Sequence, residues 1–347
     1  KQLKATTDKF AVLGNHDYGD YSIWKSEKAK LTNQEILHYF FKKIDFKLLL
    51  NEAELVKFKT TNIAIVGESG CGKSTLLEII YGLLHIEKGS VYWNENKLLG
   101  PNFRLIPGED FMKYLPQDFD LMPYITVEEN IGKNISSLNP NKQQRINELL
   151  EVVDMTTFLK TKVKNLSGGQ KQRVALAKVI AKEPEVLLLD EPFSHIDNFR
   201  KNKLRRDLFK YLKSKNILCI VATHDTTDAL SFADEILVIR DGKLVAKNTP
   251  EVLYNNLTSE YIGSFFNEVN EIPNNIINHQ SRSKKAILVY PNQIKLVEDS
   301  LLKAIVITSY FKGYHYLIEA DLKGKIIFFE HFEKLKINSE ICLKLIK

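Results

Sequence analysis

A glycine-rich loop between an apolar segment and a helical segment limits the folds open to this chain more than any other feature. The apolar run IAIV at residues 63–66 leads into GESGCGKST at residues 67–75, and the helical stretch LLEIIYGLL follows. Gly67, four residues, Gly72, Lys73 and Ser74 meet the spacing of a phosphate-binding loop. Glycines let consecutive backbone N–H groups turn around phosphate oxygens, and the helix that begins here favours anions. The pattern predicts a strand, loop and helix that bind a nucleotide.

Each residue of this loop is a candidate for nucleotide binding. Lys73 adds positive charge toward the β and γ phosphates, and the Ser74 hydroxyl is placed to ligate Mg²⁺. The predicted cofactors are therefore ATP and Mg²⁺. The full predicted set is Gly67, Glu68, Ser69, Gly70, Cys71, Gly72, Lys73, Ser74 and Thr75.

Two acidic residues end a second apolar run, VLLLDE at residues 186–191. In open α/β sheets, ligands bind at the carboxyl ends of the strands, and this run places Asp190 and Glu191 there. We expect Asp190 to hold Mg²⁺ and Glu191 to accept a proton from the attacking water. The pair extends the predicted site from binding to hydrolysis.

Strands and helices alternate through the middle of the chain. A helix is predicted to open at Ser167, because Ser167 and Gln170 have the spacing of a capping box. Further strands are predicted at residues 217–222 and 235–240, the second turning at Asp241 and Gly242 into a hairpin with residues 243–246. The alternation predicts an α/β fold with a mainly parallel sheet covered by helices.

Composition narrows the possible partners. The formal charge of +6 is spread over 49 basic and 43 acidic residues, so we predict no nucleic-acid partner. The longest apolar runs are far shorter than the roughly 20 residues that a membrane-crossing helix needs, so membrane work would require a separate subunit. Three widely spaced cysteines, Cys71, Cys219 and Cys342, fit a reducing compartment.

The string LSGGQKQR at residues 166–173 resembles the signature motif of ATP-binding-cassette (ABC) ATPases. Other pieces of that family's pattern stand in the same order along this chain. Gln117 in YLPQDFDLMPY resembles the Q-loop glutamine, SHID at residues 194–197 resembles the D-loop, and His224 in VATHD resembles the switch histidine. The resemblance runs from about Thr61 to Phe266 and implies a phosphate-loop NTPase cassette with a helical subdomain.

The resemblance also implies a mechanism. The family pairs two ATPase domains head to tail, so that the signature residues Ser167, Gly168, Gly169 and Gln170 of one subunit face the phosphate loop of the other. Glu191, His224 and Gln117 become the catalytic residues, and Ser74, Gln117 and Asp190 become the metal ligands. The implied partners are a second ATPase subunit, identical or paralogous, and transmembrane permease subunits, with residues 117–124 at the docking region. The implied location is the cytoplasmic face of the membrane, as a peripheral subunit.

The C-terminal part of the chain predicts a second, smaller domain. Residues 271–285 are polar, so residues 267–285 are predicted to be a linker, and short alternating segments at 286–347 predict a β domain. This tail resembles the OB-like domain of importer ATPases, which would make residues 61–266 the cassette of an uptake system. Asn267 and the Val289-Tyr290-Pro291 segment depart from that family's pattern. A generic dimerisation or regulatory β module is the alternative.

The first 60 residues resemble a different family. GNHD at residues 14–17 and LLLNE further on resemble the middle of a calcineurin-like metallophosphoesterase, in which Asn15 and His16 would serve a two-metal site. Asn15, His16 and Asp17 supply too few donors for such a site, and the family's other ligand motifs are missing from this sequence. We therefore expect residues 1–60 to be a fragment without phosphoesterase activity, joined to the cassette near residues 63–67.

The alternative for this segment is a diverged cassette N-terminus. In that case Tyr39, Phe40 or Phe41 would supply the aromatic ring that stacks on adenine. For the whole chain, the predicted function is the ATP-hydrolysing subunit of an ABC transporter, of the importer type. The alternatives are a metallophosphoesterase and an ABC ATPase that works outside transport.

Overall fold

The structure is a computed structural model that describes residues 10–12, 47–49, 62–86, 89–277 and 286–346. The chain divides into two compact units, one made of Lys1–Lys59 and Gly82–Pro107 and the other of Thr60–Tyr81 and Gly108–Lys347. Residues 82–107 lie within the predicted 61–266 cassette, and the predicted domain boundaries remain a prediction. No helix among the described residues has both the length and the apolar character needed to cross a membrane.

The first unit is described only in short strands. Among the described residues of this unit, β1 (Phe10–Val12) and β2 (Lys47–Leu49) form a parallel pair. There, β4 (Val91–Trp93) and β5 (Asn96–Leu98) form an antiparallel hairpin. The predicted metal-site remnant of Asn15, His16 and Asp17 lies outside the described residues, as do the candidate adenine-stacking rings of Tyr39, Phe40 and Phe41.

A six-stranded sheet forms the framework of the second unit. Its strand order is β10-β9-β3-β8-β7-β6, and all neighbouring pairs are parallel except β10 with β9. The strands are β3 (Asn62–Val66), β6 (Met112–Leu115), β7 (Val186–Asp190), β8 (Leu218–Ala222), β9 (Glu235–Arg240) and β10 (Lys243–Asn248). Every residue of β3 and β7 is buried, as expected for central strands of a parallel sheet covered on both faces.

The predicted hairpin is confirmed at β9 and β10. Arg240 pairs with Lys243, which leaves a two-residue loop, and Asp241 and Gly242 both have positive φ, at 50° and 72°. A two-residue turn of this kind requires positive φ at both central positions, which the Asp-Gly pair tolerates.

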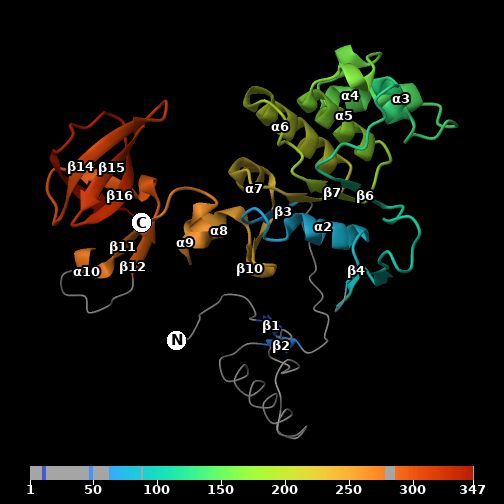
Figure 1. The fold of residues 1–347 in the computed structure, drawn as a ribbon. Helices are drawn as coiled ribbons and strands as arrows, with labels where there is room; N and C mark the ends of the chain where they lie inside the picture. Colours follow the sequence, from blue (N-terminus) through green and yellow to red (C-terminus); the bar gives the residue numbers. More distant parts are fainter. Residues whose placement is uncertain (1–9, 13–46, 50–61, 87–88, 278–285, 347) are drawn as a thin grey trace, which may run out of the picture. The chain divides into compact units, whose positions relative to one another are not determined.

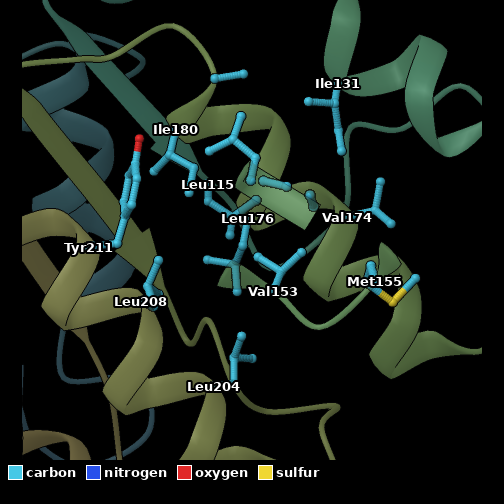
Figure 2. Close-up of a cluster of buried hydrophobic side chains, with 14 of the residues drawn as sticks. Leu115, Ile131, Val153, Met155, Val174, Leu176, Ile180, Leu204, Leu208 and Tyr211 are labelled. Carbon is cyan, nitrogen blue, oxygen red and sulfur yellow. The ribbon is translucent and has the colours of Figure 1, made fainter. Parts of the chain in front are cut away.

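Helices pack against this sheet and against one another, and they supply most of the apolar core. They are α2 (Lys73–Tyr81), α3 (Val127–Gly132), α4 (Lys142–Val152), α5 (Gly168–Ile180), α6 (Asn198–Ser214), α7 (Thr226–Phe232), α8 (Pro250–Asn255) and α9 (Glu260–Ser264), with the single 3-10 turns η1 (Thr156–Phe158) and η2 (Val163–Asn165). Figure 2 shows side chains of α5 packed among those of α3, α6 and β6, including Val174, Leu176, Ile180, Ile131, Leu204, Leu208 and Leu115. This shared core fixes the start of α5 relative to the sheet.

The C-terminal residues form a separate antiparallel sheet, shown in red in Figure 1. Its strand order is β13-β17-β14-β15-β16, and burial alternates along β14, as in a sheet with one face in a core. The strands are β13 (Ile294–Val297), β14 (Leu302–Phe311), β15 (Tyr316–Leu322), β16 (Lys325–His331) and β17 (Glu340–Leu345), preceded by the turn η3 (Pro291–Gln293). The predicted β domain is confirmed as a β-rich region, and its OB-like class remains a prediction.

The predicted linker at 267–285 differs from the structure in its first half. Its residues form β11 (Asn270–Pro273) and the short helix α10 (Asn274–Ile277), and β11 pairs with β12 (Ala286–Val289). The reason is Asn270, whose buried amide donates to the Phe328 carbonyl at 2.8 Å and accepts from the Phe328 N–H at 2.6 Å. A polar residue therefore ties this segment to β16, and composition alone does not reveal such a role.

Candidate functional site

The phosphate loop lies where the sequence places it, between the end of β3 and the start of α2 (Figure 1). Gly70 and Gly72 have positive φ, at 79° and 103°, which side chains rarely allow. A Cβ on Gly67 would lie 2.4 Å from the Ile239 carbonyl oxygen, so the loop also packs tightly against the end of β9. These positions explain why glycine is needed at three points of the loop.

Lys73 is folded into the loop. Its Nζ donates to the carbonyl oxygens of Gly67 and Glu68, both at 2.9 Å, and the side chain is only 7% exposed. A buried ammonium needs such partners, because desolvation disfavours its charge. Phosphate oxygens entering the loop can replace these carbonyls as acceptors, and the phosphate-binding role of Lys73 stays a prediction.

Asp190 ends β7 as a buried carboxylate, 4% exposed. Burial raises its pKa, and the charge of Glu191 raises it further, while the Ser74 hydroxyl and Lys73 act in the opposite direction. The Tyr114 hydroxyl of β6 lies 3.5 Å from Oδ2, and Oδ1 is buried with no hydrogen-bond partner. An orphaned carboxylate oxygen beside a serine hydroxyl fits a hard cation such as Mg²⁺.

Glu191 directly follows this strand and contacts His224. Their side chains meet with Glu191 Oε1 2.9 Å from His224 Nδ1. The Glu191 backbone has φ of 46°, a left-handed conformation that costs a non-glycine residue roughly 1–2 kcal/mol. Its N–H donates to the Ala222 carbonyl of β8 at 2.9 Å, which helps to hold this conformation. Such strain at one residue is typical of functional sites.

His224 stands on the turn between β8 and α7, and an ion-pair network fixes that turn. Asp225 caps α7 through Thr227 N–H, and the guanidinium of Arg205 on α6 contacts the carboxylates of Asp225 and Asp228 at 2.5 Å. Arg205 and Asp228 are both nearly fully buried. Nothing in the spacing of the sequence points to Arg205, because its partners are about 20 residues away.

Gln117 follows β6 by two residues and has an exposed side chain. Its strand is the neighbour of β7, so Gln117 leaves the sheet at the same edge as Asp190. The phosphate loop, His224, Asp190 and Gln117 thus follow four adjacent parallel strands, β3, β8, β7 and β6. The parallel order is what brings together residues that are far apart in sequence.

The signature residues open α5, as predicted. Ser167 accepts from the Gln170 N–H at 3.3 Å, the Gln170 side chain accepts from the Ser167 N–H at 2.9 Å, and this reciprocal pair is a complete capping box. A Cβ on Gly168 would meet no atom within 4 Å, whereas one on Gly169 would lie 2.7 Å from the His195 carbonyl. One glycine therefore faces open space, and the other lies against residues 194–197, the predicted D-loop.

Comparison with known proteins agrees with these features. A family model described as ABC transporter matches residues 50–194. The Fe(3+) ions import ATP-binding protein FbpC 2 of Pectobacterium atrosepticum is 36% identical over 233 residues, which are 67% of this chain and 67% of that protein. The corresponding FbpC protein of Pseudomonas fluorescens is 38% identical over 211 residues, 60% of each chain.

Solved structures give the same answer for the fold. A dimeric ATP-binding cassette in a post-hydrolysis state, bound to ADP and Pi, has 28% sequence identity and a TM-score of 0.50. The match covers 57% of this chain and 88% of that one. The α/β cassette predicted from the sequence is confirmed.

Proposed function

Because this chain belongs to the ABC transporter family of ATPases, we propose that it is the ATP-hydrolysing subunit of an importer and works as one of a pair of cassettes. The observation that carries this proposal is the convergence of Asp190, Glu191 and His224 at the sheet edge that also holds the phosphate loop. Three neighbouring strands supply these parts, and each part has a separate task in phosphoryl transfer.

The chain's own residues divide the chemistry among them. The loop amides and Lys73 bind the β and γ phosphates, and Ser74 and Asp190, with Gln117, would hold Mg²⁺. When bound, the metal would neutralise negative charge on the phosphates. Glu191 accepts the proton of the attacking water, and His224, which contacts Glu191 in this structure, donates a hydrogen bond to the γ phosphate.

The signature residues act on a second ATPase subunit. Gly168 faces open space at the N-terminus of a 13-residue helix, where free backbone N–H groups favour an anion. We propose that Ser167, Gly168, Gly169 and Gln170 contact the γ phosphate bound by the facing cassette. ATP then joins the two cassettes, and hydrolysis separates them.

The names of the relatives support a proposal for the transported substrate. Three relatives are named Fe(3+) ions import ATP-binding proteins, so we propose ferric iron as the first cargo to test. Cargo would pass through separate permease subunits, which dock near residues 117–124 and hold this chain at the cytoplasmic face of the membrane. The exposed side chains of Met122 and Tyr124 suit such a contact.

The proposed hydrolysis is tested by Glu191→Gln. This change removes the proton acceptor and keeps the shape of the side chain, so Mg²⁺-dependent ATP hydrolysis should fall at least about a hundredfold. ATP binding should persist, and an ATP-bound dimer should accumulate in size-exclusion chromatography. Glu185→Gln is the matched control, because Glu185 is an exposed carboxylate next to the opposite end of the same strand. Hydrolysis by Glu191→Gln at the parental rate would refute the role of Glu191.

A further inference from the structure

One buried amide on the signature helix reaches the catalytic glutamate of the same chain. Gln172 stands in the second turn of α5 and is 2% exposed. Its Nε2 donates to the backbone carbonyl of Glu191 at 3.1 Å and to Ser194 Oγ at 3.3 Å. Its Oε1 accepts from the His195 N–H at 3.0 Å. A single side chain thus joins α5 to Glu191 and to the loop that follows it.

The three bonds fix which way the amide points. The His195 N–H can only donate, and the Glu191 carbonyl can only accept, so the two ends of the amide cannot be exchanged. Both amide N–H groups and the oxygen are used, as expected for a fully buried polar group. Gln172 therefore has one defined arrangement relative to the loop.

These bonds hold the residue whose backbone is strained. The Glu191 carbonyl accepts from Gln172 and also from the Ser194 N–H at 3.2 Å, while the Glu191 N–H is bound to Ala222. A left-handed conformation at a glutamate persists only when its surroundings over-determine it. Gln172 supplies the part of that constraint that comes from the signature helix.

A second contact connects the same two elements. The α-carbon of Gly169 lies so close to the D-loop backbone that a Cβ there would be 2.7 Å from the His195 carbonyl oxygen. The first turns of α5 and residues 194–195 are thus in direct backbone contact as well as linked by Gln172. A displacement of the helix N-terminus cannot leave this loop in place, because packed backbones do not deform continuously.

We propose that Gln172 is a positioning residue that couples the signature helix to Glu191 within one chain. The proposal rests on the proposed function, in which the N-terminus of α5 contacts ATP held by the facing cassette. When that contact forms, Gln172 transmits the position of α5 to the Glu191 backbone and aligns its carboxylate for water. Each cassette would thereby hydrolyse its own ATP only when ATP is also bound in the opposite site.

The test compares Gln172→Leu with Asn270→Leu, which removes a similarly buried amide from another part of the chain. Asn270 is also a 2% exposed amide with three hydrogen bonds between elements, and it lies in the C-terminal β region. Asn270→Leu should therefore lower the melting temperature to a similar degree and leave hydrolysis unchanged. Gln172→Leu should lower kcat about tenfold or more, with KM for MgATP changed less than about twofold, because the nucleotide contacts are untouched.

A second variant keeps the test decisive if Gln172→Leu fails to fold. Gln172→Glu retains the acceptor for His195 N–H but places an ionised oxygen against the Glu191 carbonyl. Protonation of that carboxyl restores one donor, so kcat relative to the parent chain should rise as pH falls from about 8 to about 6. A role in folding alone predicts that the melting temperature recovers over this pH range while the kcat of the folded fraction stays unchanged.

The outcomes separate this inference from the proposed function. If the parent chain hydrolyses ATP and Glu191→Gln does not, but Gln172→Leu keeps the parental kcat, the coupling role is refuted and the function stands. Equal losses of kcat in Gln172→Leu and Asn270→Leu would also refute it. If the parent chain shows no hydrolysis that depends on Glu191, the proposed function itself fails.

Discussion

Two helices in this chain begin at glycine-rich sequences, and they are built for different tasks. The loop before α2 contains a buried lysine and lies beside two carboxylates, Asp190 and Glu191. The start of α5 has no acidic residue in its first turn, and its capping box occupies the N–H groups of Ser167 and Gln170. One helix start therefore lies among charged side chains, while the other presents backbone groups beside open space.

This difference suggests a way for a bound nucleotide to join two subunits. A helix N-terminus binds anions through backbone groups alone, weakly unless other groups help. Gly168 leaves the approach to the α5 terminus open among the described residues. An anion that is already held by another phosphate loop would complete this site. The two termini thus favour a head-to-tail pair over a single working subunit.

We expect the greatest loss of ATP hydrolysis when a negative charge is added at the N-terminus of α5. Gly168→Asp should leave the single subunit folded, because the space around Gly168 is open and aspartate is favourable in the first turn of a helix. The same carboxylate would repel a facing γ phosphate, so hydrolysis should fall at least about a hundredfold.

ATP binding to single subunits should persist in this variant. The measurements are ATP turnover and ATP-induced dimerisation by light scattering. The control is Gln144→Asp, which adds the same charge at an exposed position in the first turn of α4. If Gly168→Asp dimerised with ATP as the parent chain does, the α5 terminus would not be the contact for ATP held by a facing subunit.

A smaller effect, a loss of ATP affinity, is expected when the positive charge of Lys73 at the start of α2 is removed. Lys73→Ala deletes the ammonium that binds the β and γ phosphates, and a charge-assisted hydrogen bond of this kind is worth about 1.5–3 kcal/mol, or roughly tenfold to a hundredfold in affinity. Calorimetric titration with ATP measures the change. Lys303→Ala, which removes an exposed lysine paired with Glu340, should leave the affinity as it was. If Lys73→Ala bound ATP with unchanged affinity, the Lys73 ammonium would serve only to stabilise the loop.

The sequence was enough to predict several of the strands, two helix starts and one hairpin, because their signals are local. The strand before Gly67, the capping box at Ser167 and the Asp241-Gly242 turn each depend on residues within a few positions. The parallel sheet followed from the alternation of strand and helix. Long-range contacts carry no such signal. Arg205, Gln172 and Tyr114 meet their partners only after folding, and the polar segment at 271–277 joins the C-terminal β region because Asn270 is bound to Phe328.

Departures from the family pattern can also have a packing reason that sequence does not show. Tyr290 lies in the Val289-Tyr290-Pro291 segment, which departs from the pattern of the importer ATPases that this tail resembles, and the structure buries it completely. Its ring stacks on Tyr254 with the centroids 4.5 Å apart, within the core cluster that contains Val238 and Phe266. The packing of Tyr290 therefore explains an aromatic residue at this position, and the residue gives no information about the transported substrate.

The last prediction is a small gain in stability from Asp190→Asn. It tests whether the ionised Asp190 carboxylate beside the start of α2 destabilises the chain when Mg²⁺ is not bound. Burial raises the pKa of Asp190 in the folded chain above its unfolded value, and Glu191 adds to this shift. The contribution of such a group to stability is present below the unfolded pKa and is lost as pH rises through the folded pKa. At about pH 8 the nucleotide-free chain therefore carries a destabilising carboxylate.

Asp190→Asn removes that charge at nearly constant shape. The melting temperature without nucleotide should rise by a few degrees, roughly what 1 kcal/mol produces in a domain of this size. The difference from the parent chain should shrink as pH falls through the raised pKa, because the parent carboxyl is then protonated as well. With MgATP the order should reverse, since only the parent chain has a carboxylate for Mg²⁺ beside Ser74. An equal difference in melting temperature at about pH 8 and about pH 4 would assign the effect to packing and not to the ionised carboxylate.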